Sequence, residues 1–374
     1  MSRGSRLTVA LDARPLAGPL SGVGVCCDQL LRALARRADV DVSTFAVSRR
    51  AGAVRDRLPA GVALRTLSIP TRAVHAAWSI VGIPSAEYVA GRVSVVHGTN
   101  FVVPPPRHVG TVVTVHDATP WKYPELCAPA SRAYPRLVKR AVLRGAFVHT
   151  ASDFVAAELT DLLGVRLESI RVIPYGPPVA SEPRTGRAPV PVQPPYILAI
   201  GTIEPRKDYP RLVAAFAELA SKHGDLSLVI AGAEGRGRTA LDEAITAAHC
   251  RQRIVRLGHV DDSVRAALLS GATLLAYPSL YEGFGLPPLE AMAAGTAVVA
   301  AAGGAIPEIV GDGALVVPAG DTAALAGALE RVVSDEELRT DLVARGRLQL
   351  RRYSWDSTAE AMVALYRDVD AARA

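Results

Sequence analysis

Cysteine is scarce in this sequence of 374 residues, which contains only four. Cys26 and Cys27 are adjacent, and Cys127 and Cys250 stand alone, so no Cys-x-x-Cys pair or zinc-ligand spacing is present. So few cysteines also exclude a disulfide scaffold. They fit a reducing compartment, and we therefore expect a cytoplasmic protein.

Long apolar runs are absent as well. The short basic N-terminus is not followed by an apolar stretch of signal-peptide length. The longest weakly polar stretch, 291–307, is mostly alanine and holds three glycines, which makes it a poor membrane span. We expect a protein that is soluble or peripheral at the inner face of the membrane.

Acidic residues are under-represented in the first half of the chain. Residues 1–178 hold 22 basic and 12 acidic side chains, whereas the remainder holds 20 and 24, for a net charge of +6. A basic half favours an anionic partner, such as a membrane surface or a lipid phosphate, unless the arginines simply occupy solvated faces. Nucleic acid fits poorly, because aromatic residues make up 5% of the chain and are not interleaved with the basic ones.

The sequence does contain a regular alternation of short β-branched runs and longer helical patterns, which predicts two doubly wound α/β domains with parallel sheets, facing each other across a cleft. The predicted strands include 7–11, 93–97 and 110–115, and then 196–200, 226–230, 254–257, 273–277 and 297–300. The intervening proline-rich stretch is typical of a linker. We expect a first domain at 1–178, a linker at 179–195, a second domain at 196–350, and a C-terminal helix at 351–374 that returns to the first domain.

The segment 277–295 follows a predicted strand and precedes a helix. Gly283 and Gly285 would let a ligand approach the backbone closely, and the start of a helix favours an anion. Glu282 and Glu290 can accept hydrogen bonds from hydroxyl groups. The loop is therefore suited to a ligand that carries both phosphates and hydroxyls. The alternative is a solvated Glu282 and a Glu290 that caps its helix.

Two cations follow the first predicted strand of the second domain. Arg206 and Lys207 end the segment Gly-Thr-Ile-Glu-Pro-Arg-Lys at 201–207 and could pair with a diphosphate. The alternative is a pair of solvated cations. Cations are unfavourable at a helix start unless an anion lies nearby, which favours the diphosphate.

Polar residues also follow strands of the first domain. His116 and Asp117 end one strand, His97 and Asn100 lie at the end of another, and a glycine-rich turn at 18–24 follows the first. A lone histidine is often a satisfied structural residue, and for His97 capping is an equal alternative. The carboxyl end of a strand in an α/β domain favours function for His116. His249 is expected in a helix, in a structural role.

Taken together, these segments resemble the retaining, GT-B fold glycosyltransferases of family four, the group of sucrose synthases and bacterial mannosyltransferases. The resemblance covers nearly the whole chain and is strongest at 201–207, 257–260, 303–310 and the Glu-x7-Glu segment from Glu282 to Glu290. It implies that Glu282 contacts the hydroxyls of the donor sugar and that Glu290 contacts the nucleotide ribose. The chain departs from the commonest family pattern at Gly201-Thr202, where Gly-Arg is usual.

The resemblance and the residues together define a predicted site. It comprises His116, Glu282, Arg206 and Lys207 as catalytic candidates; Gly22, Gly24, Gly201, Thr202, Glu282, Gly283, Phe284, Gly285, Leu286 and Glu290 as donor-binding residues; and His97, Asn100 and Asp117 on the acceptor side. No Asp-x-Asp follows a strand in the manner that grips a metal-bound nucleotide, so we expect no catalytic metal and no other cofactor.

The expected activity is a retaining transfer of a hexose, with mannose or a deoxyhexose favoured. The donor is a nucleotide diphosphate sugar, and the acceptor is a hydroxyl of a glycan, a glycolipid or a secondary metabolite. A front-side route is favoured, because Asp117 is the only first-domain carboxylate that could serve as nucleophile and is a weak candidate. The alternatives are a nucleotide-sugar epimerase of similar fold and a degenerate, non-catalytic transferase that acts as a binding partner.

Basic residues recur at helical spacing between positions 132 and 144. Such a helix could lie on an anionic membrane, or it could be an ordinary surface helix with an apolar inner face. An apolar patch could serve the same purpose and contains Trp78, Ile80, Val81 and Ile83.

Overall fold

The computed structural model describes residues 6–49, 51–178 and 192–373, so the predicted linker lies outside the described residues except for 192–195. The chain forms two compact units. Unit 1 comprises Met1–Gly176 and Ser354–Ala374, and unit 2 comprises Pro177–Tyr353. The end of the chain therefore belongs to the same unit as its beginning. Each unit is a doubly wound α/β fold, as predicted.

Unit 1 is built on a parallel sheet of seven strands in the order β3-β2-β1-β4-β5-β6-β7. The strands are β1 (Leu7–Asp12), β2 (Val40–Val47), β3 (Ala63–Leu67), β4 (Val95–Gly98), β5 (Gly110–Thr114), β6 (Phe147–Thr150) and β7 (Ile170–Val172). All five residues of β5 are buried, as expected for a strand covered on both faces. The strand order reverses between β1 and β4, where such sheets place ligands at the carboxyl ends of the strands.

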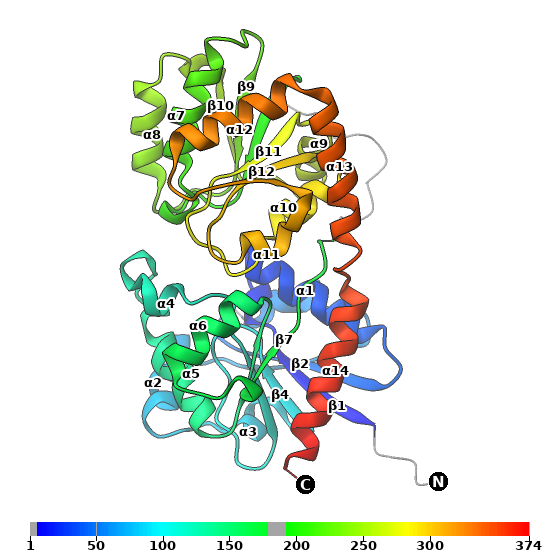
Figure 1. Ribbon diagram of the computed structural model, residues 1–374. Helices are drawn as coiled ribbons and strands as arrows, with labels where there is room; N and C mark the ends of the chain where they lie inside the picture. The colour runs from blue at the N-terminus through cyan, green and yellow to red at the C-terminus, as the bar shows by residue number, and fades with distance from the viewer. Residues whose placement is uncertain (1–5, 50, 179–191, 374) are drawn as a thin grey trace. The chain divides into compact units, whose positions relative to one another are not determined.

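The helices of unit 1 lie along its sheet (Figure 1). They are α1 (Gly22–Ala35), α2 (Thr71–Ile80), α3 (Ala86–Ala90), α4 (Thr119–Lys122), α5 (Tyr134–Leu143), α6 (Asp153–Leu163) and α14 (Trp355–Ala371). The C-terminal helix α14 packs on α1 and on β1, β4 and β5. It approaches β5 so closely that a Cβ atom at Gly110 would lie 2.6 Å from Cγ1 of Val369.

Unit 2 repeats the plan with six parallel strands in the order β10-β9-β8-β11-β12-β13. These are β8 (Tyr196–Ile200), β9 (Ser227–Ala231), β10 (Ile254–Gly258), β11 (Leu274–Tyr277), β12 (Ala297–Ala301) and β13 (Leu315–Val317). The helices are α7 (Tyr209–Ala220), α8 (Arg238–Ala247), α9 (Asp262–Gly271), α10 (Leu286–Ala293), α11 (Ile306–Val310), α12 (Thr322–Ser334) and α13 (Glu336–Leu350). The order again reverses next to the first strand, between β8 and β11.

Two expectations about local structure are wrong. The turn at 18–24 is shorter than predicted, because α1 already begins at Gly22, and Gly22 and Gly24 lie in its first turn. His249 lies outside a helix, because α8 ends at Ala247 and the chain must leave it to enter the short 3₁₀ turn Arg251–Arg253 before β10.

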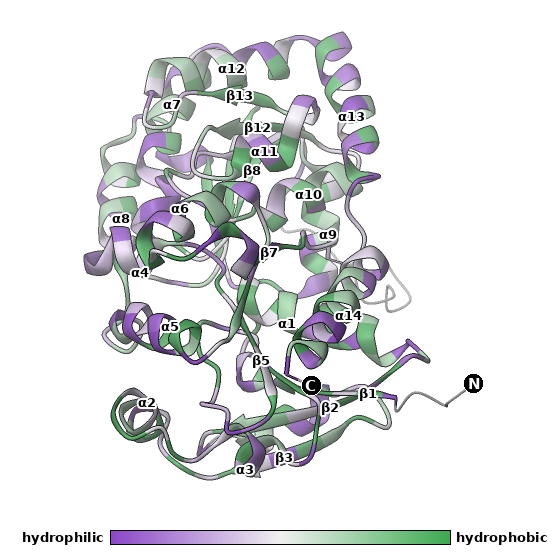
Figure 2. Ribbon diagram, turned by 60° about the horizontal axis from the view of Figure 1, so that its bottom comes forward, coloured by the Kyte–Doolittle hydropathy of each residue, from purple (hydrophilic) through white to green (hydrophobic). Residues whose placement is uncertain are grey.

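Apolar side chains gather inside each unit, and the strands are coloured mostly hydrophobic in Figure 2. The core of unit 2 packs β8, β9 and β11 against α7 and α12. Within the described ranges, no helix is long and apolar enough to cross a bilayer.

Candidate active site

The loop between β11 and α10 is shaped by a second loop of unit 2. Gly303 and Gly304 lie against its backbone: a Cβ atom at Gly303 would lie 2.0 Å from the carbonyl oxygen of Ser279, and one at Gly304 would lie 2.3 Å from that of Glu282. The amide of Ala305 also donates to the Glu282 carbonyl, at 2.8 Å. The glycines of the predicted 303–310 segment therefore act by holding Glu282 in place.

Glu282 brings the predicted cations together. Its carboxylate lies 2.6 Å from Nη1 of Arg206 through Oε2 and 2.6 Å from Nζ of Lys207 through Oε1. Burial acts to raise the pKa of Glu282, but the charges of Arg206 and Lys207 outweigh it and hold the pKa at about 2. Three of the four catalytic candidates thus form one ionic cluster in unit 2, in which Lys207 and Glu282 are buried and Arg206 is half-buried.

Lys207 is the most enclosed member of this cluster. Its Nζ donates a hydrogen bond of 2.7 Å to the hydroxyl of Tyr277 and lies 4.5 Å from the centre of that ring. Burial lowers the pKa of Lys207 to about 8, against the opposing charge of Glu282. Gly201, with φ 144°, makes room for the lysine, since a Cβ atom there would lie 3.3 Å from Lys207 Cε. Thr202 follows it, half-buried.

Glu290 has its own cation. On α10, it accepts a 2.8 Å hydrogen bond from Nε of Arg265 and a second, shorter contact from Nη2 of the same residue. Burial raises the pKa of Glu290, and Arg265 opposes that rise. Arg265 is not among the predicted site residues, because it lies in α9 and its approach to Glu290 depends on how two helices pack.

The start of α10 offers part of what an anion site requires. Gly285 has φ 129°, a region that favours glycine, and turns the chain into the helix at Leu286. Pro287 and Pro288 carry no N–H, so the amides at the positive pole of the helix dipole are those of Gly285 and Leu286. The predicted residues Gly283, Phe284, Gly285 and Leu286 are all buried. They lie directly between Glu282 and Glu290.

In unit 1, His116 follows β5 and is half-buried. Its Nε2 lies 2.9 Å from the carbonyl oxygen of Thr99, and its Nδ1 lies 3.2 Å from the hydroxyl of Tyr175. A carbonyl oxygen can only accept, so Nε2 carries the proton and Nδ1 accepts from Tyr175. Burial lowers the pKa of His116 to about 4, so the ring is neutral at physiological pH.

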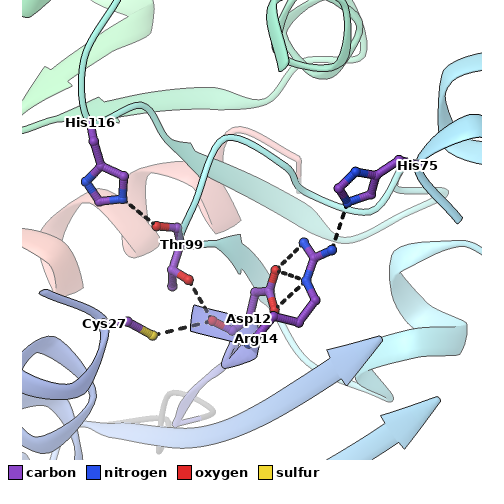
Figure 3. A network of polar contacts seen from close by, with 6 residues as sticks. All are labelled: Asp12, Arg14, Cys27, His75, Thr99 and His116. Atoms are coloured by element: carbon purple, nitrogen blue, oxygen red, sulfur yellow. Dashed lines mark hydrogen bonds and ion pairs between the residues drawn. The ribbon is translucent and has the colours of Figure 1, made fainter. Parts of the chain in front are cut away.

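A polar network joins His116 to the end of β1 (Figure 3). The Thr99 hydroxyl donates to the backbone carbonyl of Asp12 at 2.6 Å, and the buried Asp12 carboxylate accepts from Nε of Arg14 at 2.8 Å. Arg14 Nη1 lies 2.8 Å from Nε2 of His75. Asp12 and Arg14 are not among the predicted site residues, although a carboxylate at the end of an apolar strand is a signal that the sequence contains.

The acceptor-side candidates separate into two groups. His97 is fully buried in β4, and its ring nitrogens lie 2.7 Å from the hydroxyls of Tyr366 and Thr114, which fits the structural alternative. Asn100 and Asp117 are half-buried and follow β4 and β5, like His116. Asp117 accepts a 2.8 Å hydrogen bond from the amide of Thr119.

Of the two first-turn glycines of α1, only Gly24 has an explanation in packing. A Cβ atom at Gly24 would lie 3.0 Å from the carbonyl oxygen of Pro15, so the close packing of α1 on the turn Arg14–Leu16 favours a glycine. A Cβ atom at Gly22 would meet nothing within 4 Å, so packing does not explain the glycine at that position.

The basic helix is α5, which is shorter than the predicted 132–144, because Arg132 lies in the 3₁₀ turn Ser131–Ala133 and Arg144 caps the end of the helix. We call the surface formed by Arg132, Arg136, Lys139 and Arg140 the basic face of α5. No acidic partner lies within ion-pair distance, among the described residues, of Arg132, Arg136, Lys139 or Arg140. Beside this face, Leu143 is 76% exposed, and Ile80, Val81 and Ile83 are 53–68% exposed. The prediction that Trp78 belongs to this apolar patch is wrong. Trp78 is buried, and its indole N–H donates to the carbonyl of Pro84 at 2.8 Å.

Two known families match the chain. The family described as glycosyl transferases group 1 matches residues 185–349, and glycosyltransferase family 4 matches residues 20–179. O-antigen chain mannosyltransferase B of Escherichia coli is 30% identical, over 72% of this chain and 73% of its own length. A D-inositol 3-phosphate glycosyltransferase of Acidothermus cellulolyticus is 30% identical, over 98% of this chain and 90% of its own length.

Solved structures show the same fold. Sucrose-phosphate synthase from Thermosynechococcus elongatus is similar with a TM-score of 0.74 at 23% identity, covering 98% of this chain and 100% of its own. HepE of Anabaena, in complex with UDP-glucose, is similar with a TM-score of 0.72 at 18% identity, covering 97% and 100%.

Proposed function

The chain belongs to glycosyltransferase family 4, with the glycosyl transferases group 1 domain in its second half, and from this premise we propose that it transfers a hexose from a nucleotide diphosphate sugar to a hydroxyl acceptor with retention of the anomeric configuration. One observation carries the proposal: Arg206, Lys207 and Glu282 meet beside the start of α10. Cations and helix amides suit a diphosphate, and a carboxylate suits sugar hydroxyls.

The ionic cluster also bears on how the donor binds. In the free chain, Glu282 neutralises part of the charge of Arg206 and Lys207. A diphosphate would add negative charge beside both cations, where the planar guanidinium and the ammonium each suit a phosphate oxygen. Glu282 then keeps its own lone pairs for the sugar hydroxyls. Glu290, oriented by Arg265, would accept from the ribose hydroxyls.

The proposed chemistry takes place on the front face of the sugar. The acceptor oxygen bonds to the anomeric carbon, the bond from that carbon to the phosphate oxygen breaks, and the acceptor proton passes to the leaving phosphate. A carboxylate whose pKa is held at about 2, like Glu282, is a weak nucleophile, which supports this route over a covalent intermediate. Arg206, Lys207 and the helix amides would stabilise the departing diphosphate, which needs no metal ion in this proposal.

His116 is proposed to contact the donor sugar or the acceptor hydroxyl. Its ring is neutral, with Nε2–H directed to the Thr99 carbonyl, so it contributes a fixed surface and not a positive charge.

Mannose is the favoured sugar, because O-antigen chain mannosyltransferase B is among the relatives. The basic face of α5, which meets no acidic partner among the described residues, further supports contact with an anionic membrane, where a lipid-linked acceptor would be found.

Melting temperatures measured with GDP, UDP, dTDP and ADP and their mannose, glucose and deoxyhexose derivatives, with and without magnesium, would test the donor. A bound ligand stabilises the fold by RT ln(1 + [L]/Kd). We expect one nucleotide sugar to raise the melting temperature equally with and without magnesium, and Glu290→Ala to abolish the shift. Proton NMR of the product would then show whether the anomeric configuration is retained. No shift with any nucleotide would instead indicate a degenerate transferase that acts as a binding partner.

A further inference from the structure

Tyr175 lies one residue before the chain leaves unit 1 after Gly176. The chain re-enters unit 1 after Tyr353, and the first residues of that returning segment contact Tyr175 and its neighbours. Within unit 1, the ring of Tyr175 stacks on Trp355, with centroids 5.6 Å apart and planes inclined by 26°. The Thr358 hydroxyl donates to the carbonyl of Pro174 at 2.7 Å, and a Cβ atom at Gly176 would lie 2.5 Å from the Trp355 amide nitrogen.

The same tyrosine contacts His116. Tyr175 is 3% exposed, and burial raises the pKa of its hydroxyl well above 10, so the hydroxyl keeps its proton and can only be the donor toward Nδ1 of His116. On its other side, the tyrosine ring meets His149 edge to face at 5.7 Å. Trp355, His149 and His116 therefore surround one phenol ring.

The two hydrogen bonds of His116 come from different parts of the fold. Thr99, after β4, accepts from Nε2, whereas Tyr175, after β7, donates to Nδ1. A single bond would leave the imidazole free to turn about the bonded nitrogen, whereas two opposed bonds fix the plane of the ring. Phe101 packs edge to face on the imidazole at 5.9 Å, leaving it half-buried.

We propose that Tyr175 is a positioning residue for His116, because its hydroxyl fixes the plane of the imidazole ring that faces the substrate. Through its stack on Trp355, the orientation of the imidazole also depends on the segments where the chain leaves and re-enters unit 1. The effect on turnover rests on the proposed function of His116. The effect on the imidazole itself does not.

The chain offers a matched control for this proposal. Nε2 of His149 donates to the Ile173 carbonyl, so the Thr114 hydroxyl donates to Nδ1 of His149 and accepts from Nε2 of His97. Nδ1 of His97 therefore accepts from Tyr366 at 2.7 Å, which is the same kind of bond to a histidine of the same unit. His97 is fully buried in β4. Tyr175→Phe and Tyr366→Phe therefore delete the same hydroxyl from two Tyr–His pairs, only one of which includes the candidate catalytic residue.

Histidine side-chain ¹⁵N NMR and steady-state kinetics on the full chain would separate these roles. In Tyr175→Phe, the neutral imidazole of His116 loses its donor, so its pKa should rise toward the ordinary value. We expect kcat to fall about five- to tenfold, the rate equivalent of one neutral hydrogen bond, with the donor KM unchanged. Tyr366→Phe should shift the His97 resonances and the melting temperature but leave kcat within about twofold of wild type.

A second variant addresses the stack. Trp355→Leu keeps the Tyr175 hydroxyl but removes its ring partner, and it should shift the His116 resonances in the same direction, by less. Unchanged His116 resonances in Tyr175→Phe would overturn the proposal, as would a loss of kcat no larger than in Tyr366→Phe. The imidazole measurement needs no turnover, so a wild-type protein without transferase activity would contradict the proposed function alone.

Discussion

Lys207 Nζ and Glu282 Oε1 lie 2.6 Å apart, and the side chains are 8% and 9% exposed. A buried pair of this kind leaves an uncompensated charge when one partner is removed. Lys207, which we propose binds the phosphates, and Glu282, which we propose binds the sugar hydroxyls, therefore depend on each other for their charge and position.

Lys207→Ala should lower kcat about 100-fold or more, because loss of one donor to a developing anion typically costs ~10²–10³ in rate. It should also reduce the free energy of unfolding by about 1–3 kcal/mol, since Glu282 keeps Arg206 as its remaining partner. Steady-state kinetics and urea denaturation measure the two effects. Lys222→Ala is the control, because Lys222 is 65% exposed and lies 3.8 Å from its acidic partner. Unaltered turnover in Lys207→Ala would remove the lysine from the mechanism.

Arg265→Gln should weaken nucleotide binding without touching the diphosphate cluster. Glu290 would lose its cation, and its pKa, already raised by burial, would rise further, so the protonated carboxyl would become a poorer acceptor for the ribose. Because more of the carboxyl is protonated at low pH, we expect the donor Kd to increase most below neutral pH. Calorimetric titration across pH 5.5–8 tests this, with Arg238→Gln, a 64% exposed arginine on α8, as the control. Equal affinities at every pH would contradict it.

Gly304→Ala should inactivate the protein through the backbone alone. A methyl group there would lie 2.3 Å from the carbonyl oxygen of Glu282, at a φ of 66° that disfavours alanine. The displaced loop would move Glu282 away from Arg206 and Lys207, so transfer and nucleotide binding should both fall. Gly327→Ala on α12 is the matched control: nothing lies within 4 Å of its Cβ position, and the substitution should stabilise the helix by about 0.5–1 kcal/mol. A Gly304→Ala protein with normal nucleotide affinity would refute the role of this loop.

Much of the fold could be predicted, because buried parallel strands read as short apolar runs. The strand predicted at 196–200 coincides with β8, and those at 7–11 and 297–300 each differ from β1 and β12 by one residue. Short edge strands such as β7 and β13, with three residues each, are too short for an apolar run or an alternation of apolar and polar residues to identify them in the sequence.

The candidate site could be predicted only where its residues are neighbours in the sequence. Arg206 and Lys207 belong to one segment, and Glu282 to another that carries its own glycines. Arg265 lies 25 residues from Glu290 and Tyr175 lies 59 from His116, so their contacts depend on packing that no local pattern encodes.

Stability should fall on mild acidification because of four neutral histidines. Burial lowers the pKa of His75, His116 and His149 to about 4 and that of His97 well below 6.5. The unfolded chain therefore binds more protons than the folded protein between about pH 6.5 and pH 4, so this part of the stability is complete above pH 6.5 and is lost as the pH falls. Each histidine can contribute a slope of up to about 1.4 kcal/mol per pH unit.

Urea denaturation at pH 7.5, 6.5, 5.5 and 4.5 would measure this slope. His149 accepts from the Thr114 hydroxyl and donates to the carbonyl of Ile173, so His149→Asn replaces a titrating ring with an amide that cannot gain a proton. Its acid slope should be shallower than that of wild type. A free energy of unfolding that stays constant from pH 7.5 to pH 4.5 would show that the histidines do not differ between the folded and unfolded states.

The basic face of α5 should bind anionic vesicles. Within the part of the chain that the structure describes, Arg132, Arg136 and Lys139 have no acidic partner within ion-pair distance, and Leu143 and Ile80 offer apolar side chains beside them. Replacing the three basic residues with glutamine should weaken binding to phosphatidylglycerol vesicles by about 100-fold, since each is worth roughly 1 kcal/mol near an anionic surface.

Arg6, Arg36 and Arg166 form the matched control set. They are 51%, 62% and 85% exposed in the same unit, but each already has an acidic partner within 3 Å. Replacing these three arginines with glutamine removes the same formal charge from the chain. Co-sedimentation with the vesicles should then barely change if the basic face of α5 is the surface that binds. Equal losses in the two triple variants would assign vesicle binding to net charge, and binding to phosphatidylcholine alone would assign it to the apolar patch.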